Sequence, residues 1–135
     1  RRVSSSDFAH RNAPFLGDRL VVEALFELIP REPREIEEIL RPIRERRRLT
    51  QPLGARSAGC IWKNPPGASA GRLIQEAGLK GLAVGGAKVS EIHGNFIVNS
   101  GGATFSDIMA LSDRIREKVI KDFGVALEME VVVWP

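Results

Sequence analysis

The side chains best suited to chemistry in this 135-residue sequence lie together in one stretch, residues 57–66. It holds the single cysteine, Cys60, followed closely by Lys63 and Asn64. A thiol, an ammonium group and a carboxamide are thus held near one another, and together they can donate protons, carry charge and form hydrogen bonds. The same residue types also fit a structural thiol in a turn, because free cysteine often packs as a small hydrophobic side chain.

The residues around Cys60 predict a short, stiff edge. Ser57-Ala58-Gly59 can bend tightly and lets another group approach the backbone closely. Residues 60–62 are expected to form a short strand. Pro65-Pro66-Gly67 ends it, because proline has no N–H for the ladder and glycine turns the chain.

A cluster of arginines is the second candidate site. Residues 32–48 predict a helix with glutamates at its front and arginines at its back, an order that complements the helix dipole. Its apolar stripe has helical spacing and consists of Ile36, Ile39, Leu40 and Ile43. Pro42 should kink this helix or end it early. The arginines at positions 41–48 fit a solvated helix end, a phosphate clamp or a nucleic-acid surface, although no aromatic residues alternate with them to stack on bases.

Two acidic residues and one histidine complete the candidates. A final strand over residues 126–134 would place Glu128 and Glu130 on one face, which in most proteins is simply a solvated face. His93 precedes a predicted strand over residues 95–99, and such a histidine is usually hydrogen-bonded within the fold. No metal site is expected, since two distant histidines and one cysteine give no ligand spacing.

The remaining periodicities predict the elements that position these residues. A strand with one wet face is expected over residues 20–29, and two short strands over 81–90 around Gly85-Gly86. Ser69 should cap a helix over 70–77 that Gly78 ends. The clearest helix covers residues 104–123, with a capping box and a buried stripe made by Ile108, Leu111, Ile115, Val119 and Phe123. The order indicates an α+β fold, with helices packed on a mixed or antiparallel sheet in two layers.

Composition narrows the class of protein. With 43% apolar and 27% charged residues and a net charge of +3, the chain has an ordinary globular composition and too little charge to argue for nucleic acid. It contains no apolar run of about 18 residues, and its first residues do not form a signal peptide. One cysteine cannot form an internal disulfide, so a cytoplasmic location is expected. The glycine-rich segment lacks the spacing of a dinucleotide or phosphate loop.

The stretch Ser-Ala-Gly-Cys-Ile-Trp-Lys-Asn-Pro-Pro-Gly resembles the UDP-N-acetylenolpyruvoylglucosamine reductase (MurB) family. Further matching motifs follow in register at residues 69–74, 76–81, 89–90, 93–99 and 127–131. The resemblance runs over nearly all of residues 8–134 but covers only the C-terminal part of that enzyme. It implies that residues 1–52 are the end of an FAD-domain region with a connecting strand and helix, and that residues 53–135 are the substrate-binding domain.

This resemblance implies an activity. In that family NADPH reduces bound FAD, and UDP-N-acetylglucosamine-enolpyruvate is converted to UDP-N-acetylmuramate for peptidoglycan synthesis. The FAD-binding domain would precede residue 1, so the chain is expected to be inactive by itself and to need that domain as its partner, with neither nucleic acid nor membrane involved. The alternative is a non-catalytic nucleotide- or nucleic-acid-binding module that uses the arginine cluster.

The resemblance also assigns roles to residues. Cys60 stands where most members have a serine proton donor, and a thiol with an ordinary pKa of about 8.5 is a better acid than an alcohol. The other implied catalytic residues are Arg11 and Glu130, the implied substrate-binding residues are Arg48, Lys63, Asn64, His93 and Asn95, and Gly59 is assigned to the cofactor. His10, Ala13 and Met129 depart from the family's usual tyrosine, serine and proline.

Overall fold

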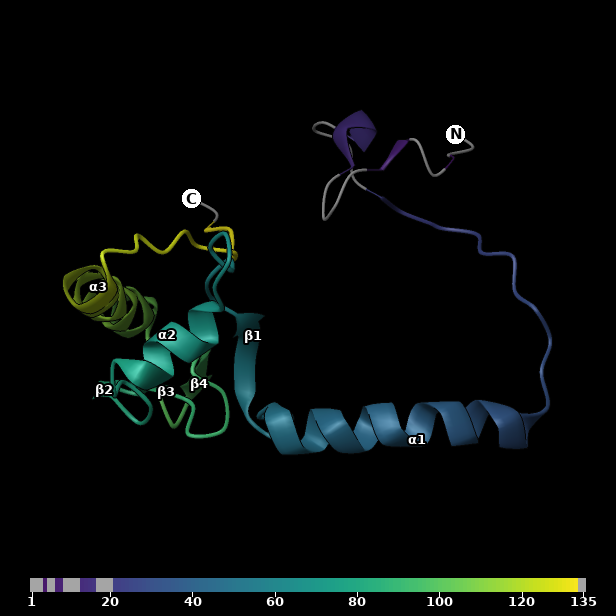
Figure 1. Cartoon of the computed structure of the whole chain (residues 1–135), viewed down its shortest axis with the longest axis horizontal. Coiled ribbons are helices and arrows are strands. Elements are labelled where there is room, and N and C mark those ends of the chain that lie inside the picture. Colours follow the sequence, from purple (N-terminus) through teal and green to yellow (C-terminus); the bar gives the residue numbers. More distant parts are fainter. Residues whose placement is uncertain (1–3, 5–6, 9–12, 17–20, 134–135) are drawn as a thin grey trace. The chain divides into compact units, whose positions relative to one another are not determined.

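The structure, a computed structural model, describes residues 4, 7–8, 13–16 and 21–133 (Figure 1). The chain divides into two units, Arg1–Pro33 and Arg34–Pro135. In the first, the short 3-10 helix η2 (Pro14–Leu16) carries Phe15, whose ring meets that of Phe8 edge to face with 5.4 Å between centroids.

The strand predicted over residues 20–29 is wrong in its described part, because residues 21–29 form no strand. Leu20 itself lies outside the described residues. The segment is extended without partners and its apolar side chains face solvent, with Leu25 98% and Val22 89% exposed. A strand requires a neighbour to satisfy its backbone groups, and an apolar pattern cannot supply one.

Helix α1 (Pro33–Thr50) confirms the predicted arginine-rich helix, except that Pro42 does not end it early. The helix continues through Pro42 for two further turns. The ion pair of Arg44 with Glu37, 2.7 Å apart, spans the proline and joins the turns on either side. Strong helix formers on both sides also favour continuation despite the lost hydrogen bond.

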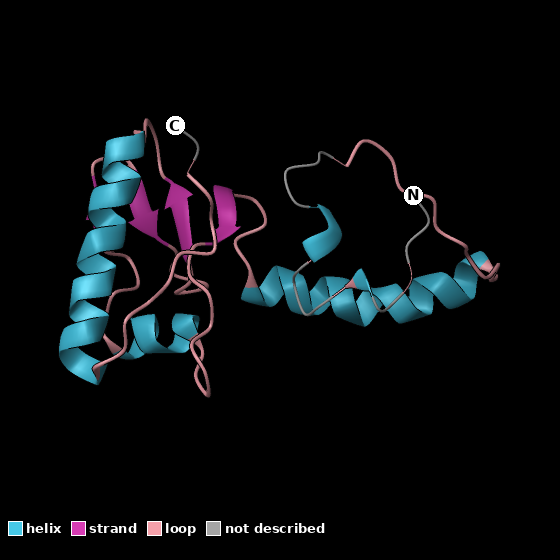
Figure 2. Cartoon of the chain, turned by 90° about the horizontal axis from the view of Figure 1, so that it is seen from above, coloured by secondary structure: helices cyan, strands magenta, loops and turns pink. Residues whose placement is uncertain are grey.

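The second unit is an α+β structure built on a four-stranded antiparallel sheet (Figure 2). Its elements after α1 are β1 (Arg56–Cys60), α2 (Ala70–Glu76), β2 (Ala83–Val84), β3 (Ala87–Val89), β4 (Phe96–Asn99) and α3 (Phe105–Phe123). The strand order is β1-β4-β3-β2. Helix α3 packs on β2 and β3 and contacts α2. The predicted fold class is confirmed, with the sheet antiparallel.

The core lies between α3 and the sheet. Its largest fully buried side chains include Trp62, Ile74, Val89, Leu111, Ile115 and Val119. Phe123, predicted to belong to this stripe, is 37% exposed, because it stands in the last turn of α3, beyond the part that the sheet covers. Burying one such aliphatic side chain contributes about 1.5–3 kcal/mol, so this layer supplies most of the domain's stability.

The predicted C-terminal strand is only partly correct. Residues 126–132 keep the predicted alternation, with Leu127 buried and Glu128 and Glu130 exposed, whereas Val133, predicted to point inward, is exposed. However, their pairing with the sheet is a single antiparallel bridge between Met129 and Trp62. The chain turns away after Trp62 and Lys63, so no longer partner strand is available. Of the strand predicted over residues 60–62, only Cys60 belongs to a strand, as the last residue of β1. Ile61 and Trp62 lie beyond β1, and Trp62 takes part only in the isolated bridge to Met129.

Two helix starts show how local chemistry fixes the elements. At α3, Thr104 and Asp107 form the predicted capping box, and Gly124 ends the helix in the left-handed region with φ 68°. The Asp107 carboxylate also accepts from the Gly86 N–H at 3.4 Å, which joins the β2–β3 turn to the helix. At α2, the Ser69 side chain makes no capping bond. Asn64 instead accepts from the Ala70 N–H at 3.0 Å.

Replacing Gly86 with alanine should destabilise the domain. A Cβ atom at this position would overlap the backbone of Gly101 and Ala103, which cannot move without breaking the bond from Ser100 N to Gly86 O. Overpacking typically costs about 1–3 kcal/mol, and each kcal/mol lowers the thermal midpoint of a small domain by roughly 4–8 °C. Circular dichroism melting measures this. In Gly54→Ala, the matched control, the new Cβ meets no atom within 4 Å. Equal losses in both variants would contradict the prediction.

Candidate functional site

Cys60 is the last residue of β1 and its side chain is exposed. The register of β1 against β4 shifts between Ser57 and Cys60, so three steps along β1 oppose two along β4. Gly59 stands inside this irregularity with φ 89°, a conformation that residues with a Cβ rarely adopt. The irregularity sets which way the thiol points. The bend predicted at Ser57-Ala58-Gly59 therefore exists, as a bulge within a strand.

The thiol belongs to the sheet face that α3 leaves open. Residues paired across antiparallel strands share a face, so Cys60 lies on the same side as Phe96, and Lys88 on the same side as Val98. The opposite face carries Ala87, Val89 and Ile97, which are buried in the core. Phe96 is also buried, and the ring of His93 packs against it at 4.9 Å. Cys60, Phe96 and His93 therefore follow one another on the open side.

Residues 61–63 are held from both sides. On one side, Ile61 N donates to Asn95 O at 2.9 Å, and the Asn95 carboxamide accepts from Trp62 N at 2.9 Å and donates to Trp62 O at 2.8 Å. On the other, Lys63 N donates to Glu128 O at 2.9 Å, and Glu130 N donates to Ile61 O at 2.8 Å. Glu130 is thereby placed opposite the residue that follows Cys60.

The Lys63 side chain lies between two carboxylates. Its ammonium forms an ion pair with Glu128, and the antiparallel pairing puts Glu130 on the same face. The hydrogen bond that the Lys63 ammonium donates to Glu128, together with the charges of Glu128 and Glu130, raises the pKa of Lys63. Lys63 therefore stays protonated at neutral pH. All three side chains are exposed, so they form a charged cluster on the segment that follows Cys60 and on its partner segment.

His93 is half-buried and oriented by its neighbours. Its Nδ1 accepts from Asn95 N at 3.1 Å, which leaves the proton of the neutral ring on Nε2. Burial, and secondarily the charge of Lys80, lowers the pKa of His93. Only glycine fits beside the ring, because a Cβ at Gly71 would lie 2.9 Å from His93 Cε1. His93 is thus a neutral donor near neutral pH.

A groove of about 670 Å³ joins His93 to the end of α1. Its basic lining residues are Arg46 and Arg47, with Thr50 and Gln51 beside them. Arg48, the arginine that the sequence favoured, is exposed and is not among the residues that line this groove. Helical geometry points consecutive side chains in different directions, and a sequence match cannot choose among three neighbouring arginines.

The structure brings some predicted residues together and leaves others apart. The pairing of residues 61–63, directly after Cys60, brings the segment of Lys63 next to that of Glu130, and Asn95 and His93 adjoin it from the other side. Arg11 lies outside the described residues, as does His10. Asn64 uses its carbonyl oxygen to cap α2. The hydrogen bonds from Asn95 to Trp62 were not foreseen, since nothing in the sequence marks two residues 33 positions apart as partners.

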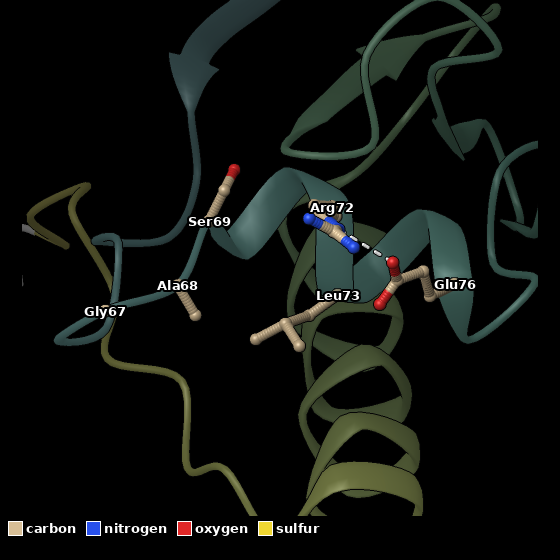
Figure 3. Close-up of a pocket in the computed structure, with 6 residues that line it drawn as sticks. All are labelled: Gly67, Ala68, Ser69, Arg72, Leu73 and Glu76. Atoms are coloured by element: carbon tan, nitrogen blue, oxygen red, sulfur yellow. Dashed lines mark hydrogen bonds and ion pairs between the residues drawn. The ribbon is translucent and has the colours of Figure 1, made fainter.

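Other hollows contain none of the predicted catalytic residues. An open depression of about 600 Å³ lies next to α2. Figure 3 shows its lining residues, among which the Arg72 guanidinium points at Glu76. This ion pair, 2.7 Å long, leaves little net charge for an anionic ligand. An apolar groove of about 450 Å³ runs between β1, the start of α3 and residues 129–133. Among the described residues, no group of three or more acidic, histidine or cysteine side chains could hold a metal ion, and no helix is long and apolar enough to cross a membrane.

A sequence profile for the C-terminal domain of UDP-N-acetylenolpyruvoylglucosamine reductase matches residues 51–134, a range that contains every described candidate residue except those on α1. The chain belongs to this reductase family. The enzyme named UDP-N-acetylenolpyruvoylglucosamine reductase 2 from Symbiobacterium thermophilum is 49% identical over 128 residues, which are 94% of this chain and 42% of the relative. The reductase from Moorella thermoacetica is 46% identical over 127 residues, with the same shares.

A solved structure agrees with this family membership. The crystal structure of UDP-N-acetylenolpyruvylglucosamine reductase from Thermus caldophilus superposes with a TM-score of 0.68 at 47% sequence identity. The match covers 81% of this chain and 38% of that one. The chain therefore spans less than half the length of the reductases that it matches, and the α+β fold is that of their C-terminal domain.

The domain should lose stability as the pH falls below neutrality, and His93 should cause part of this loss. An unfolded histidine binds its proton near pH 6.5, whereas the pKa of folded His93 is lower. The unfolded state then binds more protons, so the free energy of unfolding decreases from about pH 7 through the folded pKa. Denaturant titrations at several pH values measure this slope. His93→Gln should reduce the slope of the free energy of unfolding against pH. His10→Gln measures how much of that slope comes from the second histidine. An unchanged slope in His93→Gln would contradict the prediction.

Proposed function

We propose that this chain is the substrate-binding and proton-donating part of an FAD- and NADPH-dependent reductase, which converts UDP-N-acetylglucosamine-enolpyruvate to UDP-N-acetylmuramate. The observation that carries the proposal is the position of Cys60. It lies exposed on the open face of the sheet, directly before Ile61, whose carbonyl accepts from Glu130 N, and within a segment that the family profile matches. The reaction serves peptidoglycan precursor synthesis, and we place it in the cytoplasm.

The described residues fit a cofactor that is bound mainly by the preceding part of a longer polypeptide. They contain no phosphate-binding loop, but a Cβ at Gly59 would meet no atom within 4 Å, so the backbone beside Cys60 is open to a planar group. When bound, the flavin reduced by NADPH supplies the hydride that the outer vinyl carbon receives.

Cys60 completes the reduction by protonating the carbon beside the substrate carboxylate. The thiol gives its proton to this carbon, and the resulting thiolate recovers a proton from solvent, which its exposure permits. At neutral pH most thiol groups with a pKa of about 8.5 are protonated and ready to donate. The serine found in most members has a far less acidic hydroxyl, so the replacement by cysteine preserves the role.

Charge around Cys60 supports the intermediate. Arg11 would place a fixed positive charge at the substrate carboxylate, where negative charge develops. Glu130, in its protonated form, would donate a hydrogen bond to the enolate end, and Lys63, held by Glu128, supports the same region. Asn64 retains its amide N–H groups for substrate, because its carbonyl oxygen caps α2.

The uridine diphosphate end would lie along the groove from His93 to α1. His93 offers a neutral N–H donor, and Arg46, Arg47 and Arg48 supply positive charge for the diphosphate. Among these three, Arg46 and Arg47 line the groove, whereas Arg48 is the family match. The alternative, a binding module that uses the arginine cluster without catalysis, is not favoured by membership in a reductase family.

Residues 1–52 would complete the preceding domain. As a strand, residues 21–29 would place Val22, Ala24, Phe26 and Leu28 on one apolar face and the two glutamates on the other. These residues are exposed, with Phe26 at 77%, and so are the isoleucines of the α1 stripe, with Ile39 at 51%. A run of exposed apolar side chains within one segment is typical of an interface. The relatives, of which this chain covers 42%, are long enough to supply the partner.

Replacing Cys60 with alanine in the longer polypeptide should separate the two half-reactions. Reduction by NADPH should proceed at the normal rate, because Cys60 has no role in it. Reoxidation by UDP-N-acetylglucosamine-enolpyruvate should slow by about 10²–10⁴-fold, the usual contribution of a positioned acid. Stopped-flow absorbance follows both steps. Cys60→Ser should keep part of the activity, and a normal reoxidation rate in Cys60→Ala would exclude the thiol as the donor.

Glu130→Gln and Glu128→Gln form a matched pair on one exposed face. Glu130→Gln should lower the rate of reoxidation by about 10²-fold or more, because it removes a carboxylate that contacts the reacting end. Glu128→Gln removes only an exposed ion pair with Lys63, so the rate should change little. Single-turnover kinetics measure both. Equal effects would show that the two carboxylates act only through Lys63.

Phe26→Asp should destabilise the longer polypeptide, because it places a charge on the apolar face of the proposed strand. The thermal midpoint should fall by several degrees, which corresponds to roughly 1–3 kcal/mol. Glu27→Ala, on the opposite face, is the control and should have little effect. Equal midpoints for Phe26→Asp and the unaltered protein would contradict the placement of residues 21–29 in the preceding domain.

A further inference from the structure

We infer that Asn95 is a positioning residue that fixes the backbone of the segment joining Cys60 to Lys63, and that its side chain does not bind substrate. This inference rests on the proposed function of Cys60 and Lys63. It replaces the substrate-binding role that the family resemblance suggested for Asn95 with a different one, in which the carboxamide acts on the protein's own backbone.

The Asn95 side chain is buried and its hydrogen bonds are directed at one residue. It is 3% exposed. Its Oδ1 accepts from Trp62 N at 2.9 Å, and its Nδ2 donates to Trp62 O at 2.8 Å. These two bonds mimic a neighbouring strand, since they satisfy both backbone groups of one residue. A substrate cannot take these two bonds without displacing Trp62.

The backbone of Asn95 is fixed as well. Its N–H donates to His93 Nδ1 at 3.1 Å, and its carbonyl accepts from Ile61 N at 2.9 Å. The side-chain and backbone bonds of Asn95, together called the Asn95 clamp, therefore link His93 to the segment that carries the proposed catalytic groups. On the far side of that segment, residues 128–130 supply the other backbone bonds.

The clamp matters because β1 ends at Cys60 and regular pairing with β4 ends with it. On the β4 side, backbone-to-backbone bonds stop at the bond from Ile61 N to Asn95 O, yet Trp62 and Lys63 lie beyond it. The Asn95 carboxamide supplies the missing constraint at Trp62, between the thiol and the ammonium. A small rotation of this peptide would move both groups, and misplacement by about 1 Å can lower a rate 10²-fold.

Asn95→Asp gives a sharp test, because a protonated carboxyl group has the same shape and donor–acceptor pattern as the carboxamide. When ionised, it can still accept from Trp62 N but sets a carboxylate oxygen against Trp62 O. We expect kcat of the longer polypeptide to fall at least tenfold at about pH 8 with little change in KM. Activity should recover as the pH falls through the carboxyl pKa, which burial raises.

Asn99→Asp is the matched control. Asn99 stands at the other end of β4, and its Oδ1 accepts from Gly101 N and Ala103 N, a role that aspartate can keep. This variant should show normal kcat and no acid recovery. A rise in KM with unchanged kcat in Asn95→Asp would mean direct substrate contact and overturn the inference, as would unaltered kinetics.

A second readout does not require turnover. The rate of Cys60 alkylation by iodoacetamide reports the position of the thiol and should change several-fold in Asn95→Asp at about pH 8, relative to Asn99→Asp. Peptide mass spectrometry assigns the signal to Cys60, the one cysteine of residues 1–135. If the unaltered protein does not use the enolpyruvyl substrate, the proposed function fails while this measurement still tests the clamp. An unchanged alkylation rate would overturn the clamp.

Discussion

The hydrogen bonds that hold residues 61–63 from both sides are the constraint on which the candidate site depends. Asn95 supplies them from the β4 side and residues 128–130 supply them from the C-terminal side. Each set comes from a region remote in sequence, so the site exists only when the whole domain is folded. Cys60, Lys63 and Glu130 therefore depend on the stability of the sheet and on the return of the chain after α3.

The two-layer architecture explains why chemistry is located where it is. Helix α3 covers one face of the sheet with an apolar stripe, and the face that carries Cys60 is left open. The capping box of α3 also accepts the Gly86 N–H, so the helix and the β2–β3 turn are fixed together. A rigid scaffold on one side and an open face on the other is the arrangement in which exposed polar residues can meet a ligand.

The departures from the family pattern are physically mild. Met129 replaces a proline that most members have, and the ladder bonds here use Glu128 O and Glu130 N. These bonds do not involve the N–H at position 129, so a proline or a methionine fits the same pairing. The exchange of serine for Cys60 likewise keeps a proton donor at the end of β1. By contrast, His10, the departure directly before Arg11, falls outside the described residues.

Sequence by itself determined the helices, the fold class and the family resemblance. Helical periodicity and caps located α1, α2 and α3, and the stretch around Cys60 carried the family resemblance. The tertiary structure decided which groups meet, because contacts between residues far apart in sequence leave no periodic signal. In the folded domain the Asn95 carboxamide is hydrogen-bonded to the backbone of Trp62, and Arg46 and Arg47 line the same groove as His93. The predicted C-terminal strand pairs through one bridge only. Residues 21–29 form no strand, because a strand also requires a neighbouring strand for its backbone hydrogen bonds, and the residue pattern of one segment does not show whether a neighbour exists.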